Sequence, residues 1–84
     1  MDLQFTARAW DDYLYWQKQD RATLRRINLL IRDIQRSPFQ GIGQPEMLRF
    51  GLSGSWSRRI DLEHRIIYRV ADQTLVVLQC RYHY

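Results

Sequence analysis

The first part of the chain carries hydrophobic residues at a helical period. Between residues 7 and 19 they recur at positions i, i+3 and i+4, as Trp10, Tyr13 and Leu14, which is the spacing of one helix face. Thr6 stands directly before this segment, and a threonine hydroxyl is a good N-terminal cap. The pattern predicts a helix over residues 7–19.

A second helix is predicted from Asp20, as its cap, to about Arg36, where Ser37-Pro38 stops it. Its apolar stripe has spacings of three and four and consists of Leu24, Ile27, Ile31 and Ile34. On the other side, a row of arginines falls within one narrow sector at ~100° per residue: Arg21, Arg25, Arg32 and Arg36. This row is either a solvated face or a contact surface for RNA phosphates or an acidic partner.

After a loop over residues 39–45, which contains Gly41 and Gly43, the period of the pattern changes to two. A turn over Gly51–Gly54 and the two-residue connection Asp72-Gln73 separate the segments with this period. The predicted strands are Leu3–Phe5, Met47–Phe50, Trp56–Asp61, His64–Ala71 and Thr74–Tyr82. The fold class is therefore α+β: two N-terminal helices on one face of a mostly antiparallel sheet of about five strands.

The length of 84 residues predicts one domain, residues 1–84, because no second core is plausible at this size. The N-terminus lacks a basic region with a long apolar stretch, and no segment approaches the ~20 apolar residues of a membrane span. We expect a cytoplasmic protein with no membrane association. A single cysteine, Cys80, excludes an internal disulfide framework, and its apolar surroundings favour a buried, inert thiol.

The charge of the chain favours an anionic partner. Thirteen basic residues against nine acidic ones give a net charge of +4, and Lys18 is the only lysine among the basic residues. Arginine grips phosphate oxygens in pairs and stacks on bases. The composition favours RNA over DNA or a membrane, although many small proteins are mildly basic.

Strand alternation sorts the polar residues of the second half onto one sheet face. Ile66, Tyr68 and Val70 would face the helices, and Arg59 and Arg65 the other side. The same alternation in the last strand places Arg81 and His83 together. Such a set of cations requires an anion or a carboxylate, which predicts a phosphate site.

RNA cleavage without a metal or cofactor needs three kinds of group: a base, a cation and an acid. The sequence offers a candidate for each. Glu46 is the only carboxylate between Asp33 and Asp61, and His83 lies at the end of the chain between two tyrosines. Glu46 as base, arginine as phosphate clamp and His83 as acid would suffice. Equally, Glu46 can be a surface carboxylate and His83 a frayed end.

Motifs along the whole chain resemble the YoeB-type toxins of the RelE/ParE superfamily. They are Trp10-Asp11-Asp12-Tyr13-Leu14-Tyr15-Trp16, Ser37-Pro38-Phe39, Gly41-x-Gly-x-Pro45-Glu46, Leu52-Ser53-Gly54-x-Trp56-Ser57-Arg58-Arg59-Ile60, Glu63-His64-Arg65 and Cys80-Arg81-Tyr82-His83-Tyr84. The last of these is the most specific. Because the motifs occur in order, the resemblance covers essentially the entire chain.

The resemblance implies a microbial-ribonuclease-like or RelE-like fold and a homodimer that cuts messenger RNA in the A site of the small ribosomal subunit. By position, Glu46 matches the general base, His83 the general acid and Arg65 the cation at the scissile phosphate, with Arg59 in support. Tyr84 matches an aromatic that shapes the site. Arg49 stands where the family often has lysine, so the geometry of that RNA contact is in question.

The resemblance also implies a cognate antitoxin whose acidic C-terminal segment wraps the toxin. Two rival functions remain. One is a non-enzymatic toxin of the same fold that inhibits DNA gyrase, similar to ParE toxins, which would not require Glu46, Arg65 and His83. The other is a plain RNA-binding module in which the arginines contact phosphate without chemistry.

Overall fold

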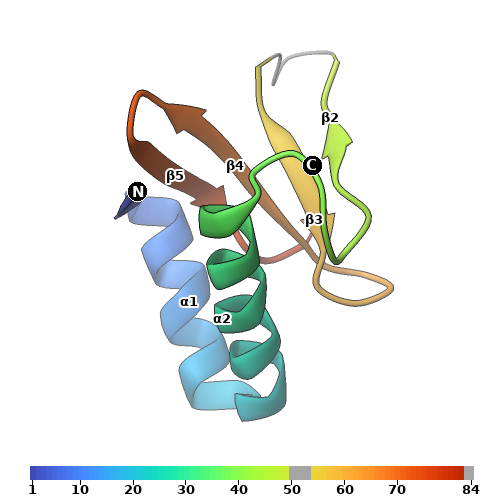
Figure 1. Cartoon of the computed structure of the whole chain (residues 1–84). Coiled ribbons are helices and arrows are strands. Elements are labelled where there is room, and N and C mark those ends of the chain that lie inside the picture. Colours follow the sequence, from blue (N-terminus) through green and yellow to red (C-terminus); the bar gives the residue numbers. More distant parts are fainter. Residues whose placement is uncertain (50–53, 83–84) are drawn as a thin grey trace.

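A computed structural model describes residues 1–49 and 54–82 of the chain. Two helices, α1 (Ala7–Gln19) and α2 (Arg21–Arg36), lie side by side on one face of a sheet (Figure 1). The sheet has the strand order β1-β5-β4-β3-β2. Its strands are β1 (Asp2–Phe5), β2 (Glu46–Met47), β3 (Trp56–Arg59), β4 (Arg65–Ala71) and β5 (Thr74–Gln79).

The predicted α+β architecture is confirmed. The N-terminal strand β1 joins an edge of the sheet, parallel to β5, and the other three pairings are antiparallel. Within the described residues, no helix is long and apolar enough to cross a membrane.

Both helix starts form as their sequences predict. The hydroxyl of Thr6 accepts a hydrogen bond from the backbone N–H of Ala9 at 3.1 Å. Asp20 serves both helices: its own N–H donates to Trp16 at the end of α1, and its carboxylate accepts from the first turn of α2. Hydrogen bonding, above all from the hydroxyl of Thr23, lowers the pKa of Asp20. A connection of one residue makes the helices adjacent and antiparallel.

The predicted stripe of α2 faces the core: Ile27, Ile31 and Ile34 are buried and Leu24 is half-buried. The predicted face of α1 does so only at Tyr13, which is half-buried against the core. Trp10 and Leu14 are 48% and 39% exposed, and the buried residues of α1 are instead Ala9, Asp12 and Trp16. The small side chain of Ala9 permits the close approach of α1 to Cys80, whose sulfur lies 3.6 Å from the Ala9 carbonyl.

The last strand is shorter than predicted, because it ends at Gln79 and not at Tyr82. The N–H of Cys80 donates to the Asp12 carboxylate at 3.0 Å, and the Cys80 carbonyl accepts from the indole of Trp16 at 2.8 Å. Side chains of α1 therefore form hydrogen bonds with the backbone N–H and carbonyl of Cys80, which a longer β5 would pair with a neighbouring strand. Residues 50–53, which belong to the predicted strand 47–50 and the predicted turn 51–54, lie outside the described part of the chain.

Among the described residues, Arg58 is the largest fully buried side chain, and the sequence pattern did not single it out. It lies on the core face of β3 between Trp56 and Ile60. Each of its five N–H bonds has an acceptor: the Asp33 carboxylate, the Tyr68 hydroxyl and the carbonyls of Ser37, Gln40 and Ile42. Full hydrogen bonding is what makes a buried guanidinium tolerable.

This arginine fixes the loop that leads to β2. Gly41 has φ +137°, and a Cβ there would lie 2.1 Å from a carboxylate oxygen of Asp33, so glycine is required. The N–H of Arg59 then donates to the Gly43 carbonyl at 2.7 Å. The loop is thus attached to both α2 and β3 before it delivers Glu46 to the sheet.

We expect Asp33→Asn to destabilise the protein in a pH-dependent way. Hydrogen bonds, first from the N–H of Ile42 and then from Arg58, hold the pKa of Asp33 below its ordinary value. Such a carboxylate stabilises the fold above its unfolded pKa of ~3.9, and this contribution is lost as the pH falls through the lowered pKa. Urea unfolding should show a less stable variant at pH 7 and a shrinking difference below about pH 4.

The exposed carboxylate of Asp11 on α1 provides the matched control. Asp11→Asn should change the unfolding free energy little at any pH. Equal stability of wild type and Asp33→Asn at pH 7 would contradict a structural role for the Arg58–Asp33 pair.

Candidate active site

The strand register gathers the predicted site residues of β2, β3 and β4 on one sheet face. Glu46 pairs with Ser57 across β2 and β3, and Arg59 pairs with Arg65 across β3 and β4. Ser57 and Arg59 are two residues apart and so share a face. Because Arg58 between them points into the core, this face is turned away from the helices.

Two arginines directly opposite each other on one sheet face repel. Both are only half-exposed, and the Nε of Arg59 and one terminal nitrogen of Arg65 are buried without a hydrogen-bond partner among the described residues. The Ser57 hydroxyl beside them is also buried and without a partner there. Buried donors without acceptors are costly. Donors of this kind, with positive charge, suit an oxoanion such as a phosphate.

Arg81 reaches its position differently from the way the sequence predicted. It follows the end of β5, so strand alternation does not set its direction. Its guanidinium lies over the ring of Tyr15, 3.5 Å from the centroid, and 4.6 Å from that of Tyr82. Its Nε is likewise buried with no partner in the described structure. Stacking on two rings stabilises the cation and leaves its N–H groups available.

The C-terminal segment lies against the first residues of β4. The Tyr82 carbonyl accepts from the backbone N–H of Arg65 at 2.8 Å, and the Tyr82 N–H donates to Nδ1 of His64 at 2.6 Å. His83 and Tyr84, the predicted acid and the predicted aromatic of the site, lie outside the described residues. The chain is nevertheless held beside Arg65 up to the peptide that precedes them.

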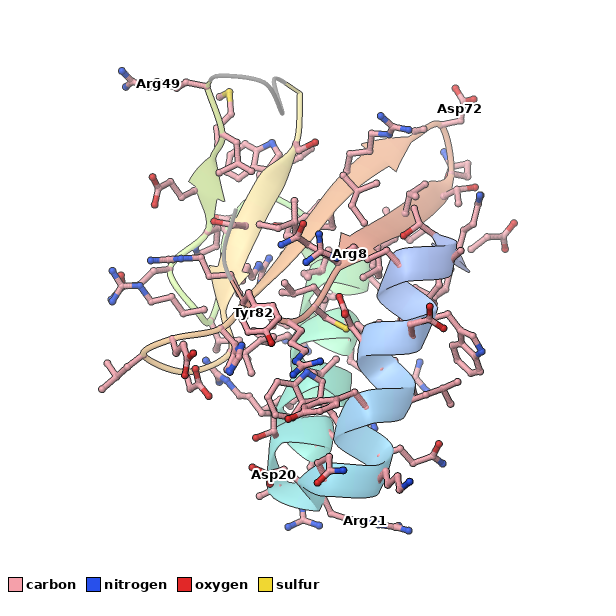
Figure 2. All side chains as sticks on the ribbon, turned by 180° about the vertical axis from the view of Figure 1, so that it is seen from behind. Arg8, Asp20, Arg21, Arg49, Asp72 and Tyr82 are labelled. Atoms are coloured by element: carbon pink, nitrogen blue, oxygen red, sulfur yellow. The ribbon has the colours of Figure 1, made fainter. Side chains whose placement is uncertain are left out.

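The structure does not bring all predicted site residues together. Glu46 is exposed at the start of β2, on the site face. Arg49 is exposed beyond the end of β2 and points into solvent, away from Tyr82 (Figure 2).

The arginine row of α2 is exposed, as its position opposite the apolar stripe implies. Arg36 also forms an ion pair with Asp33 at 2.6 Å. Arg26, which lies outside the row and was not predicted, donates to the carbonyls of Arg59 and Ile60 at 3.1 and 3.3 Å. It thereby holds the end of β3 that carries Arg59.

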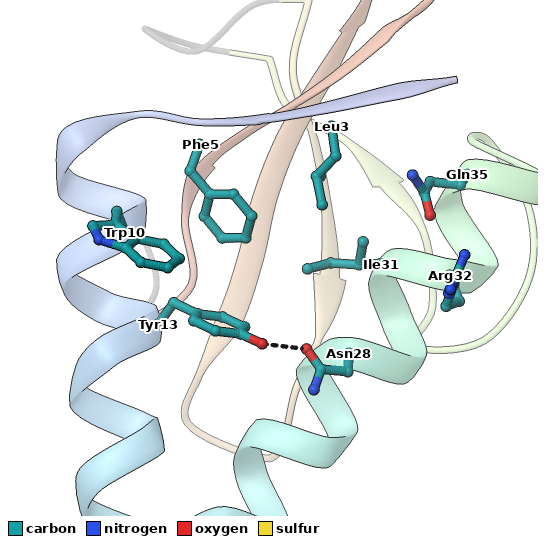
Figure 3. Close-up of a pocket in the computed structure, with 8 residues that line it drawn as sticks. All are labelled: Leu3, Phe5, Trp10, Tyr13, Asn28, Ile31, Arg32 and Gln35. Carbon is teal, nitrogen blue, oxygen red and sulfur yellow. Dashed lines mark hydrogen bonds between the residues drawn. The ribbon is translucent and has the colours of Figure 1, made fainter.

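A cavity of about 660 Å³ lies elsewhere, between β1, α1 and α2 (Figure 3). Phe5, Trp10 and Tyr13 form one wall, and Tyr13 donates to Asn28 at 2.8 Å. Among the described residues that line it, Arg32 is the only charged one. These described lining residues include no carboxylate or imidazole, and the Tyr13 hydroxyl is bonded to Asn28.

Other chemistry finds little support in the described residues. Cys80 is buried, as predicted, and burial raises the pKa of its thiol to about 12, so the thiol stays protonated and unreactive. Among residues 1–49 and 54–82, no group of three His, Cys, Asp or Glu side chains is arranged to hold a metal ion.

A family model described as a YoeB-like toxin of bacterial type II toxin–antitoxin systems matches residues 5–84. The chain is 54% identical to the toxin YoeB of Synechocystis sp. over all 84 residues, which span 98% of that protein. The solved structure of a YoeB/ParE toxin from Agrobacterium tumefaciens is similar over the full length of both chains, with 49% identity and a TM-score of 0.96.

YoeB from Staphylococcus aureus has been solved in a heterotetrameric complex with the antitoxin YefM and as a dimer. In both structures the YoeB chain is 40% identical in sequence to this chain. Each match covers 100% of this chain and 98% of the S. aureus chain, with TM-scores of 0.92 and 0.93.

We expect inorganic phosphate to bind at the paired arginines. It should raise the melting temperature, since a ligand that binds only the folded state stabilises it, and it should shift the Nε–H resonances of Arg59 and Arg81. Arg65→Lys should weaken both effects, because a point charge does not reproduce the paired contacts of a guanidinium. The control is Arg69→Lys on the same strand, at an exposed position. Equal losses in the two variants would indicate general charge screening and no site.

Proposed function

Because the chain belongs to the family of YoeB-like toxins of bacterial type II toxin–antitoxin systems, we propose that it is an endoribonuclease that cleaves messenger RNA in the ribosomal A site. Cleavage of the codon there would stop translation. The observation that carries this proposal is the cross-strand pair Arg59–Arg65 with unpartnered buried N–H groups, on the same sheet face as Glu46.

The proposed reaction needs no metal ion or cofactor. The Glu46 carboxylate takes the proton of the ribose 2′-hydroxyl, and the 2′-oxygen attacks the adjacent 3′ phosphate. Arg65, with Arg59 beside it, stabilises the added negative charge of the five-coordinate phosphorus. His83 gives a proton to the leaving 5′-oxygen. The products are a 2′,3′-cyclic phosphate and a free 5′-hydroxyl, so atoms and charge balance.

The remaining site residues have supporting roles in this proposal. Tyr84 shapes the site beside His83. Arg81 presents its guanidinium, stacked between Tyr15 and Tyr82, to an RNA phosphate. Arg49, which is exposed beyond β2, contacts RNA farther from the cleaved bond.

The partners follow from the same family membership. The S. aureus relative forms a dimer and a complex with YefM, and this chain is proposed to act as a homodimer and to bind a cognate antitoxin in the cytoplasm. A net charge of +4 suits an antitoxin with an acidic C-terminal segment that covers the arginine face.

We expect Glu46→Ala and His83→Ala each to slow cleavage by ~10²–10⁴-fold, which is the usual contribution of a general base or acid. The measurement is single-turnover cleavage of a messenger RNA with a defined codon in the A site, with and without ribosomes. Both variants should keep the wild-type melting temperature, because Glu46 is exposed and the proposed role of His83 is in the reaction and not in the core.

Gln44→Ala, at an exposed position two residues before Glu46, is the control and should cleave at the wild-type rate. A wild-type rate in Glu46→Ala or His83→Ala would refute the role of that residue. Loss of DNA supercoiling by gyrase with no RNA cleavage would favour a ParE-like toxin, and RNA binding without either effect would favour a plain binding module.

We also expect the arginines of α2 to contribute to ribosome binding. Arg21, Arg25 and Arg32 are exposed and can be replaced by Gln with little effect on helix propensity. Each lost phosphate contact should reduce the slope of log K against log salt by roughly 0.7–0.9. Ribosome pelleting across a salt series, with the triple Gln variant beside wild type, measures this slope.

Arg36 belongs to the same proposed surface but is tested separately, because its ion pair with Asp33 links it to the fold. Lys18→Gln removes one exposed charge from α1 and is the control for overall charge. Unchanged binding of the triple variant at every salt concentration would make the row a solvated face or an antitoxin surface.

A further inference from the structure

Tyr82, the last described residue, adopts a backbone conformation that needs support. Its φ is +63°, in the left-handed region that residues other than glycine rarely adopt. Two hydrogen bonds hold its peptide groups, one to Nδ1 of His64 and one from the N–H of Arg65. Uncommon conformations of this kind persist where the surroundings enforce them, and they cluster at functional sites.

His64 is well fixed as an acceptor. Its side chain is 10% exposed, and its ring stands edge-on to Trp16, with the centroids 4.8 Å apart. The backbone N–H of His64 donates to the Asp61 carboxylate at 2.6 Å, and this bond holds the backbone at the start of β4. Since Nδ1 accepts from a backbone N–H, it carries no proton, and the neutral ring has its proton on Nε2. Nε2 lies 3.6 Å from a Glu63 oxygen.

We propose that His64 is a positioning residue of the cleavage reaction: its Nδ1 fixes the Tyr82 peptide and so sets where the chain delivers His83 relative to Arg65. Arg65 would then have two functions, since its side chain meets the phosphate and its backbone N–H anchors the segment that carries the acid. The proposal rests on the proposed function for the role of His83. Misplacement of a catalytic group by ~1 Å can cost about 10²-fold in rate.

The alternative is that the His64 ring only fills space beside Trp16. Two substitutions separate these roles. His64→Asn keeps an acceptor, because the Asn Oδ1 can occupy the place of Nδ1, but it loses most of the ring. His64→Phe keeps the ring against Trp16 and loses the acceptor. The control is Leu62→Ala, in the same β3–β4 connection, where the side chain is 100% exposed.

The experiment measures single-turnover cleavage at saturating ribosomes together with ribosome affinity. Relative to wild type, His64→Phe should cleave about tenfold to a hundredfold more slowly with unchanged affinity. His64→Asn should stay within a few-fold of wild type even where its melting temperature falls. A wild-type rate in His64→Phe would overturn the proposal. So would a loss in His64→Asn as large as that in His64→Phe.

A second measurement does not depend on activity or on the folding of a variant. In the wild-type protein, the Tyr82 amide should be protected from hydrogen exchange, and the 15N shift of His64 Nδ1 should be that of an unprotonated acceptor nitrogen. Rapid exchange at Tyr82 would overturn the anchor itself. If wild type cleaves no RNA, the proposed function fails, and these two signals still decide whether His64 holds Tyr82.

Discussion

The buried guanidinium of Arg58 is the interaction on which the rest of the structure depends. It joins a carboxylate of α2, a hydroxyl of β4 and three carbonyls of the loop that follows α2. Without it, the carbonyls of Ser37, Gln40 and Ile42 would lose their donor, and, within the described residues, only the Pro38 and Gly43 carbonyls would still bind the loop to the sheet on its way from α2 to Glu46. The two glycines of the loop are consistent with this role, because the loop passes so close to Asp33 and Leu30 that a Cβ would collide.

A second constraint follows from placing two arginines opposite each other on adjacent strands. The core face of β3 and β4 is filled by apolar residues and Arg58, so alternation turns Arg59 and Arg65 to the other face. Their mutual repulsion and unpartnered N–H groups are unfavourable for the free protein. An anion would relieve both costs, and this is the reason for proposing that the face binds RNA phosphate and an acidic antitoxin segment.

The end of the chain is held by a third set of contacts. Asp12 and Trp16 of α1 form hydrogen bonds with the backbone N–H and carbonyl of Cys80. His64 and Arg65 do the same with the backbone N–H and carbonyl of Tyr82. The segment thus leaves the sheet after β5 and runs against the start of β4. In the proposed reaction the acid would be carried on this segment and the cation on the strand to which it is tied.

The sequence by itself determined the two helices with their caps, the presence of the strands and the face of β3 and β4 that carries Arg59 and Arg65, because periodicity and capping are local. The sequence did not determine which face of α1 is buried, since Ala9 and Asp12 are buried because they contact Cys80 and not because of their hydrophobicity. The sequence pattern also predicted, wrongly, that the last strand continues past Gln79. The α1 side chains that bind the backbone of Cys80 in place of a neighbouring strand are distant in sequence, so the pattern does not reveal them. Arg58 had a signal, a charged residue between Trp56 and Ile60 on the apolar face, but its acceptors come from α2, β4 and a loop. Only the tertiary structure brings such distant groups together, and for that reason it alone decided how the loop, the paired arginines and the chain end meet.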